Sequence, residues 1–369
     1  MKIHVVTSAK FPPTEGIGTY IWDISAHMVK HGHEVVIHSR HHAQKQEDYF
    51  NGSLRIIHHR VPRVPIINSL YFSLKLSFVA WRTTGICTWV YHSPLVLPLL
   101  NSHQHNVATI HSTMLEDTKF IESVNLNAVL NKMAGKTYSR FFESILFKRC
   151  KKIIIVNKDI SEELNRYKFS AEVEYIPNLI DTTKFKHTNG YKNTKIAYIG
   201  RLSYRKGIIP LLDALLSLKE VFLTNNMTFQ FIGDGQLKLF ISTFIKDNDL
   251  QNFIEIKSVT AAEIPHCLNE LKAIIMPSTY ETGPRVVLEA ASSGVLCVAT
   301  RVGLVKNFKD QHFIEISRSA SSEIQESLIK VFEMSLEDYQ ESTDKCYEYV
   351  HKNFSIKNNF TKLMVAYGG

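Results

Sequence analysis

The most informative segment of the chain is Ser278-Thr-Tyr-Glu-Thr-Gly-Pro-Arg-Val-Val-Leu-Glu-Ala-Ala290. It follows the apolar run Ala273–Met276, which predicts a buried strand. Its glycine and proline predict a loop, and a helix is expected to begin near Arg285. Glu281 then lies on a strand-to-helix loop, and Glu289 lies about one turn inside the helix. The two carboxylates can therefore do different chemistry, and the loop amides and helix N-terminus favour an anion or a sugar hydroxyl between them.

Two glutamates at this spacing are common on solvated helices, but here a strand, a proline, a glycine loop and a small-residue helix accompany them. The segment resembles the signature of the retaining glycosyltransferases of family four, which have the GT-B fold. The resemblance implies an α/β protein with two Rossmann-like doubly wound domains that face each other across a cleft. It also implies transfer of a sugar from a nucleotide-diphosphate sugar to an acceptor hydroxyl, with retention at the anomeric carbon.

The composition is that of an ordinary globular protein of two domains. The 369 residues fit two domains of about 180 residues each, and the chain is 44% hydrophobic and 21% charged. Five cysteines without CxxC spacing argue against a zinc site or a disulfide framework and fit a reducing cytosol. The N-terminus predicts a strand rather than a signal peptide, and the apolar region Gly85–Leu100 is too short to span a bilayer. We expect a cytoplasmic protein.

The net charge of +8 is unevenly distributed. Residues 1–180 contain 21 lysines and arginines against 14 aspartates and glutamates, whereas the second half is nearly balanced. A basic N-terminal half can attract anionic lipid, nucleic acid or acidic saccharide, although a generally basic proteome explains it equally well. Aromatic and basic residues also lie together in the segments Ile66–Trp81 and Asn127–Lys152. These segments fit either the protein core or peripheral contact with an anionic membrane at the inner face of the cytoplasmic membrane.

Strands alternate with helices through both halves of the sequence, which predicts parallel sheets of doubly wound topology. In the first half, strands are expected at Lys2–Ser8, Val35–His38, Arg55–His59, Gly85–Tyr91, Val107–Ile110 and Ile153–Val156, and helices at Gly18–His31 and Asn127–Phe147. In the second half, strands are expected at Lys195–Ile199, Met227–Ile232, Phe253–Lys257, Ala273–Met276 and Val295–Thr300, and helices at Ser321–Met334 and Leu336–Phe354.

The pattern resets near Tyr175–Asp181, and the polar stretch Thr182–Lys195 follows. We therefore expect an N-terminal, acceptor-side Rossmann-like domain at residues 1–180 and a C-terminal, nucleotide-sugar-binding Rossmann-like domain at residues 181–352. By the resemblance, residues 353–369 form a C-terminal helix that packs back on the N-terminal domain. In open parallel sheets, ligands bind beyond the carboxyl ends of the strands, and the motifs below follow such ends.

Two cations follow the first predicted strand of the second half. The segment Ile199-Gly-Arg-Leu-Ser-Tyr-Arg-Lys-Gly207 places Arg201 and Lys206 on a loop with glycine at both ends. A guanidinium and an ammonium can bracket a diphosphate and stabilise it as it leaves. In isolation a solvated basic loop is as good an interpretation. The segment is similar to the G-R-L-x-x-x-K-G pattern of the family, which implies the diphosphate-clamping role and no essential metal.

Glycine turns follow two other predicted strands. Gly16 and Gly18 follow the first strand and open a helix, where glycine lets the backbone approach a phosphate. The segment lacks a GxGxxG fingerprint, so NAD is not expected. Gly233 lies in Phe231-Ile-Gly-Asp-Gly235, which is similar to a turn near the nucleotide base in the family. Structural turns without ligand contact explain both glycine segments as well.

His111 follows the predicted strand Val107–Ile110, where the family often has a histidine close to the donor sugar and the acceptor hydroxyl. An imidazole there can bond the sugar or orient the nucleophilic hydroxyl. The family commonly continues with aspartate, whereas this chain has Ser112. The resemblance thus implies catalytic roles for Glu281, His111, Arg201 and Lys206. It implies donor binding by Gly16, Gly18, Arg201, Lys206, Gly233, Glu281, Gly283, Arg285 and Glu289.

The donor is expected to be a nucleotide-diphosphate sugar and the acceptor a saccharide or a lipid-linked saccharide, as in lipopolysaccharide, capsule or exopolysaccharide synthesis. Two other functions share the fold. A sugar-nucleotide epimerase would convert the donor alone, and a non-catalytic subunit would bind nucleotide sugar without turnover. Nucleic-acid binding would use the positive charge, but the sequence contains no helix-turn-helix, zinc or RNP motif to support it.

Overall fold

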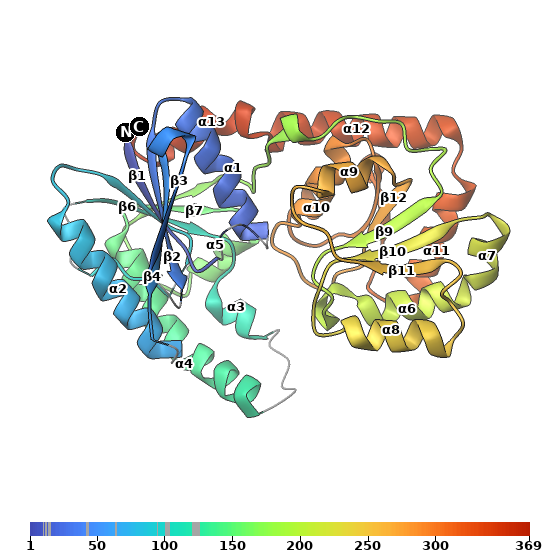
Figure 1. Cartoon of the computed structure of the whole chain (residues 1–369), viewed down its shortest axis with the longest axis horizontal. Coiled ribbons are helices and arrows are strands. Elements are labelled where there is room, and N and C mark those ends of the chain that lie inside the picture. The colour runs from blue at the N-terminus through green and yellow to red at the C-terminus, as the bar shows by residue number, and fades with distance from the viewer. Residues whose placement is uncertain are drawn as a thin grey trace. The chain divides into compact units, whose positions relative to one another are not determined.

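The computed structural model describes residues 1–9, 11, 13, 16–41, 44–62, 65–93, 95–99, 104–119 and 126–369. The chain divides into two compact units, one made of Met1–Leu179 and Asn359–Gly369 and the other of Ile180–Asn358. Residues 353–358, which the sequence places outside the second domain, belong to the second unit. Each unit is an α/β structure built on its own sheet, as the sequence predicts (Figure 1).

In the described residues, the first unit has an eight-stranded sheet in the order β3-β4-β2-β1-β5-β6-β7-β8. Its strands are β1 (Lys2–Val6), β2 (Glu34–His41), β3 (Lys45–Tyr49), β4 (Leu54–Arg60), β5 (Thr88–Tyr91), β6 (His105–Ile110), β7 (Lys152–Ile155) and β8 (Glu172–Tyr175). Its helices are α1 (Gly16–Lys30), α2 (Pro65–Arg82), α3 (Met114–Lys119), α4 (Leu126–Arg149) and α5 (Asp159–Leu164), and α13 (Ile356–Ala366) enters it from the second unit.

The pairs of this sheet are parallel, except that β3 runs antiparallel to β4 at the edge. The polar sequence Lys-Gln-Glu-Asp-Tyr of β3 has no apolar alternation, which is why the sequence does not predict this strand. One face of the sheet is covered by α2 and α4, whose residues Phe72, Leu76 and Phe142 share a core with Trp89 of β5. Helix α1 lies on the other side (Figure 1). Covering both faces is typical of a parallel sheet.

A row of histidines crosses the core of the first unit. His4 Nδ1 lies 2.9 Å from His38 Nε2, and His38 Nδ1 lies 2.9 Å from His59 Nε2. The rings of His4 and His38 stack on Trp89. Burial lowers the pKa of His4 and of His59 to about 4 and lowers the pKa of His38 well below its usual value. The row is therefore neutral at physiological pH, since burial disfavours the charged imidazolium.

The second unit has a parallel six-stranded sheet, in the described residues, of order β11-β10-β9-β12-β13-β14. Its strands are β9 (Lys195–Ile199), β10 (Thr228–Ile232), β11 (Ile254–Lys257), β12 (Ala273–Met276), β13 (Leu296–Thr300) and β14 (Ile314–Ile316). Its helices are α6 (Ile208–Ser217), α7 (Lys219–Thr224), α8 (Lys238–Asp247), α9 (Ile264–Asn269), α10 (Arg285–Ser292), α11 (Ser321–Glu333) and α12 (Leu336–Phe354).

Successive side chains of these strands point to opposite faces of the sheet, so they pack into two separate cores. Tyr198, Phe229 and Ile275 belong to the core that also contains α6 and α11. Ala197 and Ile274 belong to the core that contains α10 and α12. The sheet is therefore covered on both faces, and the loops at the carboxyl ends of its strands are left to form a site.

The end of the chain returns to the first unit. Tyr367 is fully buried, and its carbonyl accepts a hydrogen bond from Thr88 Oγ1 at 2.9 Å. Lys362 Nζ donates to the carbonyl of Tyr175 at 2.7 Å. The two termini are neighbours, because a Cβ atom added to Gly369 would lie 2.9 Å from the sulfur of Met1 (Figure 1). The first unit is thus assembled from both ends of the chain.

Candidate active site

Three neighbouring strands of the second unit direct the sequence-predicted residues to one edge of the sheet. Strands β10, β9 and β12 lie side by side and run parallel. Gly233 follows β10, Arg201 and Lys206 follow β9, and Glu281 follows β12. Because parallel strands end at the same edge, these loops meet there.

Lys206 and Glu281 form a direct ion pair between the loops after β9 and β12. The side chains are only 16% and 12% exposed. Ser278 Oγ donates a second hydrogen bond to the same carboxylate oxygen of Glu281, at 3.1 Å. A carboxylate that accepts bonds from an ammonium and a hydroxyl is held in one orientation.

Arg201 lies on the same loop as Lys206, and its backbone contacts Tyr198 of β9. The Tyr198 hydroxyl donates to the backbone carbonyl of Arg201 at 2.7 Å. Burial and then the negative charge of Glu281 raise the pKa of Tyr198 well above its usual value, while the charges of Arg205 and Arg201 act in the opposite direction. Glu281 and both arginines are therefore within electrostatic range of the Tyr198 hydroxyl.

Backbone contacts fix the distance between the two loops. The amide and the hydroxyl of Thr279 both donate to the carbonyl of Arg205, at 2.9 and 3.0 Å. Gly207 has φ +70°, and a Cβ atom there would lie 2.0 Å from the carbonyl oxygen of Pro277. Only glycine permits this close approach and this left-handed backbone. The loops therefore bring Lys206 to Glu281 through the main chain as well as through the ion pair.

Gly233 packs against the start of the Arg201 loop. A Cβ atom on Gly233 would lie 2.0 Å from the carbonyl oxygen of Gly200, and the amide of Leu202 donates to the carbonyl of Asp234 at 2.9 Å. The turn after β10 therefore needs glycine for packing against its neighbour loop, and donor contact at Gly233 stays a prediction.

The second glutamate is held inside helix α10. Arg285 Nε donates to Glu289 Oε1 at 3.0 Å, and the side chains are 9% and 13% exposed. Arg285 is the first residue of α10, and Pro284 is its N-cap. Since a carboxylate has about four acceptor positions, Glu289 keeps capacity for ligand hydroxyls beside this bond. Gly283, in the loop before α10, is half-buried.

His111 belongs to the first unit, where it follows β6 and is buried. Its Nε2 atom lies 3.1 Å from Nδ1 of His92, which follows the neighbouring strand β5. The ring of Tyr20 contacts both imidazoles edge-on. Burial lowers the pKa of His111 to about 4, although a hydrogen bond with the Asn178 side chain opposes this, and burial lowers the pKa of His92 well below its usual value. Both rings are neutral at pH 7.

The glycines of the N-terminal motif lie in the same unit. Gly16 is the first residue of α1 and is exposed, and Gly18 is buried in its first turn. Glu15, which precedes them, lies outside the described residues. The described residues contain no group of three or more His, Cys, Asp or Glu side chains arranged to hold a metal ion. The helices among them include none with the length and apolar character that crossing a bilayer requires.

Two family models match the chain in succession. Residues 14–184 match the model described as Glycosyltransferase Family 4, and residues 180–352 match the model described as Glycosyl transferases group 1. The chain belongs to glycosyltransferase family four. The fold agrees, since sucrose-phosphate synthase from Thermosynechococcus elongatus, a solved structure, superposes with a TM-score of 0.82 at 12% identity and covers 100% of this chain and 98% of its own. The GT-B fold expected from the sequence is thereby confirmed.

Two curated relatives of this family-four glycosyltransferase extend the comparison. A phosphatidylinositol N-acetylglucosaminyltransferase component of Arabidopsis thaliana is 23% identical over 82% of this chain and 68% of its own length. UDP-Gal:alpha-D-GlcNAc-diphosphoundecaprenol alpha-1,3-galactosyltransferase of Escherichia coli is 24% identical over 57% of this chain and 56% of its own length. The expectation that the protein is a hexosyltransferase-type glycosyltransferase is confirmed.

Three polar residues of these clusters are absent from the sequence prediction. Ser278 forms a hydrogen bond with Glu281, Tyr198 forms one with the backbone of Arg201, and His92 forms one with His111. A usable signal existed for His92, because it follows a predicted strand directly, just as His111 does. No comparable signal marks Tyr198, which lies inside a strand and looks like a core residue.

Proposed function

We propose that this glycosyltransferase is a retaining enzyme that transfers a sugar from a nucleotide-diphosphate sugar to a lipid-linked saccharide acceptor in cell-envelope polysaccharide synthesis. The observation that carries the proposal is the largely buried Lys206–Glu281 pair at the carboxyl ends of adjacent parallel strands, with Arg201 on the same loop as Lys206. This arrangement offers fixed positive charge to a diphosphate and a fixed carboxylate to a sugar.

The proposed role of each site residue follows from the chemistry of its side chain or backbone. Arg201 and Lys206 stabilise the negative charge that develops on the departing diphosphate, in a site where their charges are already oriented. Glu289, anchored by Arg285, accepts hydrogen bonds from the ribose hydroxyls. Glu281 and the Gly283–Arg285 loop position the sugar. Gly233, Gly16 and Gly18 let the backbone come close to the donor, and His111 of the first unit orients the acceptor hydroxyl or the sugar.

The contacts of Glu281 bear on how retention would be achieved. Lys206 and Ser278 both bind Oε1 of Glu281, and these charge-assisted bonds weaken the carboxylate as a nucleophile. We therefore favour a front-face displacement over a covalent sugar–enzyme intermediate. In this step the bond from the anomeric carbon to the diphosphate oxygen breaks, and the acceptor oxygen bonds to the same face. The acceptor proton passes to the departing diphosphate.

The relatives support a lipid-linked acceptor. By their names, the Arabidopsis thaliana protein acts on phosphatidylinositol, and the Escherichia coli protein acts on a diphosphoundecaprenol-linked sugar with UDP-Gal as donor. We extend this to a UDP-sugar donor, an acceptor anchored at the inner face of the cytoplasmic membrane, and peripheral contact of the enzyme with that anionic surface. The candidate pathways are lipopolysaccharide, capsule and exopolysaccharide synthesis.

The proposal is tested with a panel of UDP-sugars and an undecaprenyl-diphosphate-linked saccharide. Thermal shift identifies the donor, since a ligand of the folded state raises its stability. Transfer is then followed by mass spectrometry, and the anomeric configuration of the product by NMR. We expect the product to keep the configuration of the donor sugar. An inverted product would refute retention, an epimer formed from donor alone would favour the epimerase, and binding without turnover would indicate a non-catalytic subunit.

A further inference from the structure

Helix α2 of the first unit directs its larger apolar side chains to solvent. Exposed side chains at positions 67, 71, 74, 78 and 81 recur at steps of four and three residues, which places them on one stripe, and Trp81 is 60% exposed. We call this stripe the α2 outer face; its residues are Ile67, Leu70, Tyr71, Leu74, Phe78 and Trp81. A contiguous apolar stripe of this kind on a folded protein indicates an interaction surface.

The opposite face of α2 packs without these residues. Its apolar contribution to the core comes from Phe72, Leu76 and Ala80, and Ser69, Ser73 and Ser77 lie buried in line beside them. The amides of Leu97 and Leu99 donate to Ser73 Oγ and Ser77 Oγ at 2.9 and 2.8 Å. Hydrogen bonds thus hold the inner face of α2 to the segment that follows β5. The bulky outer residues are not needed for the core, so their exposure calls for another explanation.

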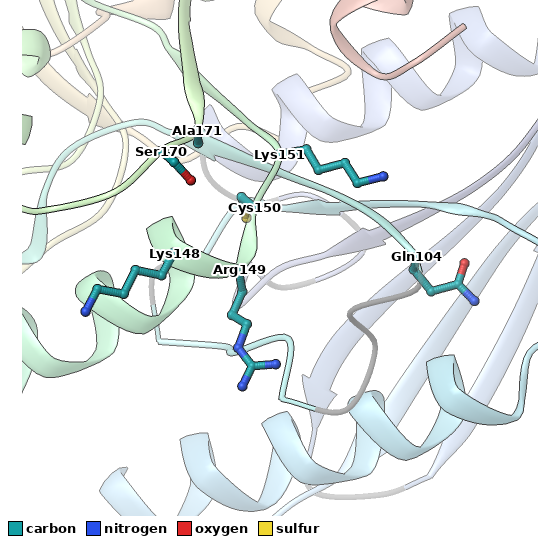
Figure 2. Close-up of a pocket in the computed structure, with 7 residues that line it drawn as sticks. All are labelled: Gln104, Lys148, Arg149, Cys150, Lys151, Ser170 and Ala171. Atoms are coloured by element: carbon teal, nitrogen blue, oxygen red, sulfur yellow. The ribbon is translucent and has the colours of Figure 1, made fainter.

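A basic pocket of about 460 Å³ opens next to the end of this helix. We call it the Lys148–Lys151 pocket; Gln104, Lys148, Arg149, Cys150, Lys151 and Ser170 are among the residues that line it. Figure 2 shows the three cationic side chains spreading from the chain around Cys150. No acidic side chain is found among the described residues of its lining.

Hydrogen bonds join this pocket to α2. The side-chain amide of Gln104 donates to the carbonyl of Ala80, in the last turn of α2, and to the carbonyl of Gly85, both at 3.3 Å. Arg149 Nη1 reaches the carbonyl of Leu99 at 3.4 Å, in the segment that the α2 serines hold. The pocket therefore adjoins the last turn of α2, where the α2 outer face ends.

The positive charge of α2 and of the Lys148–Lys151 pocket indicates what kind of partner binds there. The α2 sequence contains no aspartate or glutamate, and it has Lys75 and Arg82. The Arg82 guanidinium lies over the Phe78 ring at 5.3 Å. A second copy of this chain would set like charges against each other, whereas phosphate groups complement them. Aromatic and aliphatic side chains bordered by cations are also what an amphipathic helix presents to a lipid interface.

We infer that the α2 outer face and the Lys148–Lys151 pocket together bind an anionic lipid bilayer. Helix α2 lies in the headgroup layer with Leu74, Phe78 and Trp81 toward the acyl chains. A lipid phosphate occupies the pocket. This inference rests on the proposed function, because it identifies the surface that makes the membrane contact, yet it requires no donor and no catalysis.

The test is sedimentation of the full-length protein with vesicles of phosphatidylcholine, with or without phosphatidylglycerol. Phe78→Ser/Trp81→Ser should weaken partition onto phosphatidylglycerol vesicles at least about tenfold, since each buried aromatic side chain contributes strongly to transfer from water. Lys148→Ser/Lys151→Ser should weaken it by about fivefold per lysine. Salt should weaken the binding of the wild type to anionic vesicles.

Matched controls come from the second unit. Leu239→Ser/Phe240→Ser removes two exposed apolar side chains of α8, of which Leu239 is 79% exposed. Lys246→Ser/Lys330→Ser removes two exposed lysines from α8 and α11. Both control variants should bind as the wild type does. Circular dichroism and the melting temperature verify that all variants are folded.

Three results would overturn the inference. In the first, the wild type does not bind phosphatidylglycerol vesicles. In the second, the test and control variants weaken vesicle binding equally. In the third, the wild type is a dimer without lipid and Phe78→Ser/Trp81→Ser converts it to a monomer. The last result would assign the face to a second copy. Transfer by the wild type to a water-soluble acceptor is measured in parallel. A wild type that transfers sugar but does not bind vesicles rejects the surface and leaves the proposed function standing.

Discussion

Lys206 and Glu281 are separated by 75 positions in sequence, yet they form a direct ion pair between the loops that follow two adjacent strands. The pair joins the positive segment proposed to hold a diphosphate to the carboxylate proposed to hold a sugar. A donor that contacts both residues would bring its leaving group and its sugar to one place. The ion pair therefore links the two halves of the proposed donor site.

Substitution of either partner should remove transfer without unfolding the protein. For Lys206→Met and Glu281→Gln we expect kcat/KM to fall at least about a hundredfold, since one preorganised electrostatic group contributes that much to a developing charge. The control Lys195→Met removes a lysine that pairs with Glu270 at the start of β9, and it should leave transfer unchanged. Wild-type-like turnover in both site variants would contradict the assignment.

Transfer should not require a metal ion. Arg201 and Lys206 provide the positive charge that a divalent cation supplies in other phosphate-transfer sites. We expect dialysis against EDTA to leave the initial rate unchanged, and added Mg²⁺ or Mn²⁺ to have no effect. Loss of activity in EDTA with recovery on adding either metal would show that the two side chains do not suffice.

His92 should act on the reaction only through His111. Loss of one hydrogen bond to a positioned imidazole corresponds to about a tenfold fall in kcat/KM, which we expect for His92→Ala. In the His111→Ala background the same substitution should have no further effect, because the group it positions is gone. Steady-state rates of the four proteins in this double-mutant cycle give the coupling. Additive losses would mean that the two histidines act independently.

Gly207→Ala should destabilise the second unit by more than about 1 kcal/mol, because φ is +70° and the new Cβ would lie 2.0 Å from the Pro277 carbonyl oxygen. Gly32→Ala is the matched control, since Gly32 has φ +80° with nothing within 4 Å of an added Cβ. The control tests the strain of the left-handed backbone without the contact. Urea unfolding curves give both free energies, and equal losses would show that the close approach is relaxed easily.

The first unit should lose stability on acidification. The folded pKa of His4, His59 and His111 is about 4, against about 6.5 in an unfolded chain, so the unfolded state binds more protons between these values. Stability is therefore full above about pH 6.5 and falls as the pH falls toward 4. Removing one such imidazole with His59→Gln should flatten the dependence by about 1.4 kcal/mol per pH unit.

Tryptophan fluorescence can follow this transition selectively, since Trp22, Trp81 and Trp89 all belong to the first unit. Urea midpoints from pH 7.5 to pH 4.5 would be compared for the wild type, His59→Gln and the control His266→Gln, which changes an exposed histidine of the second unit. An unchanged slope in His59→Gln would mean that the buried row does not control the acid sensitivity.

Periodic patterns in the sequence predict the framework of the fold well. Strands β9 and β12 have the predicted bounds, because short apolar runs between turn residues mark them clearly. Strand β3 could not be predicted, since its five polar residues are strand only through pairing with β4. Helix α2 shows a second limit, because its sequence leaves core and surface open, whereas the structure buries Phe72 and Leu76 and exposes Phe78 and Trp81.

For the site, motif spacing identifies the charged residues but not their partners. Lys206 and Glu281 are recognisable from their loops, whereas Ser278 and Tyr198 enter through contacts that only the folded chain makes. The close approach of Gly207 to Pro277 is likewise a long-range property of two loops. Local patterns cannot specify such contacts, because they depend on which strands become neighbours.

The return of the last residues to the first unit has a consequence for biosynthesis. Met1–Leu179 leave the ribosome before Ile180–Asn358, whereas Asn359–Gly369, with the buried Tyr367, emerge only after that segment. The intervening segment, Ile180–Asn358, is continuous and can complete its own core while translation proceeds. The N-terminal segment therefore stays incompletely packed until Asn359–Gly369 have been synthesised, and a nascent chain truncated before Asn359 would expose the hydrophobic surface that this segment covers.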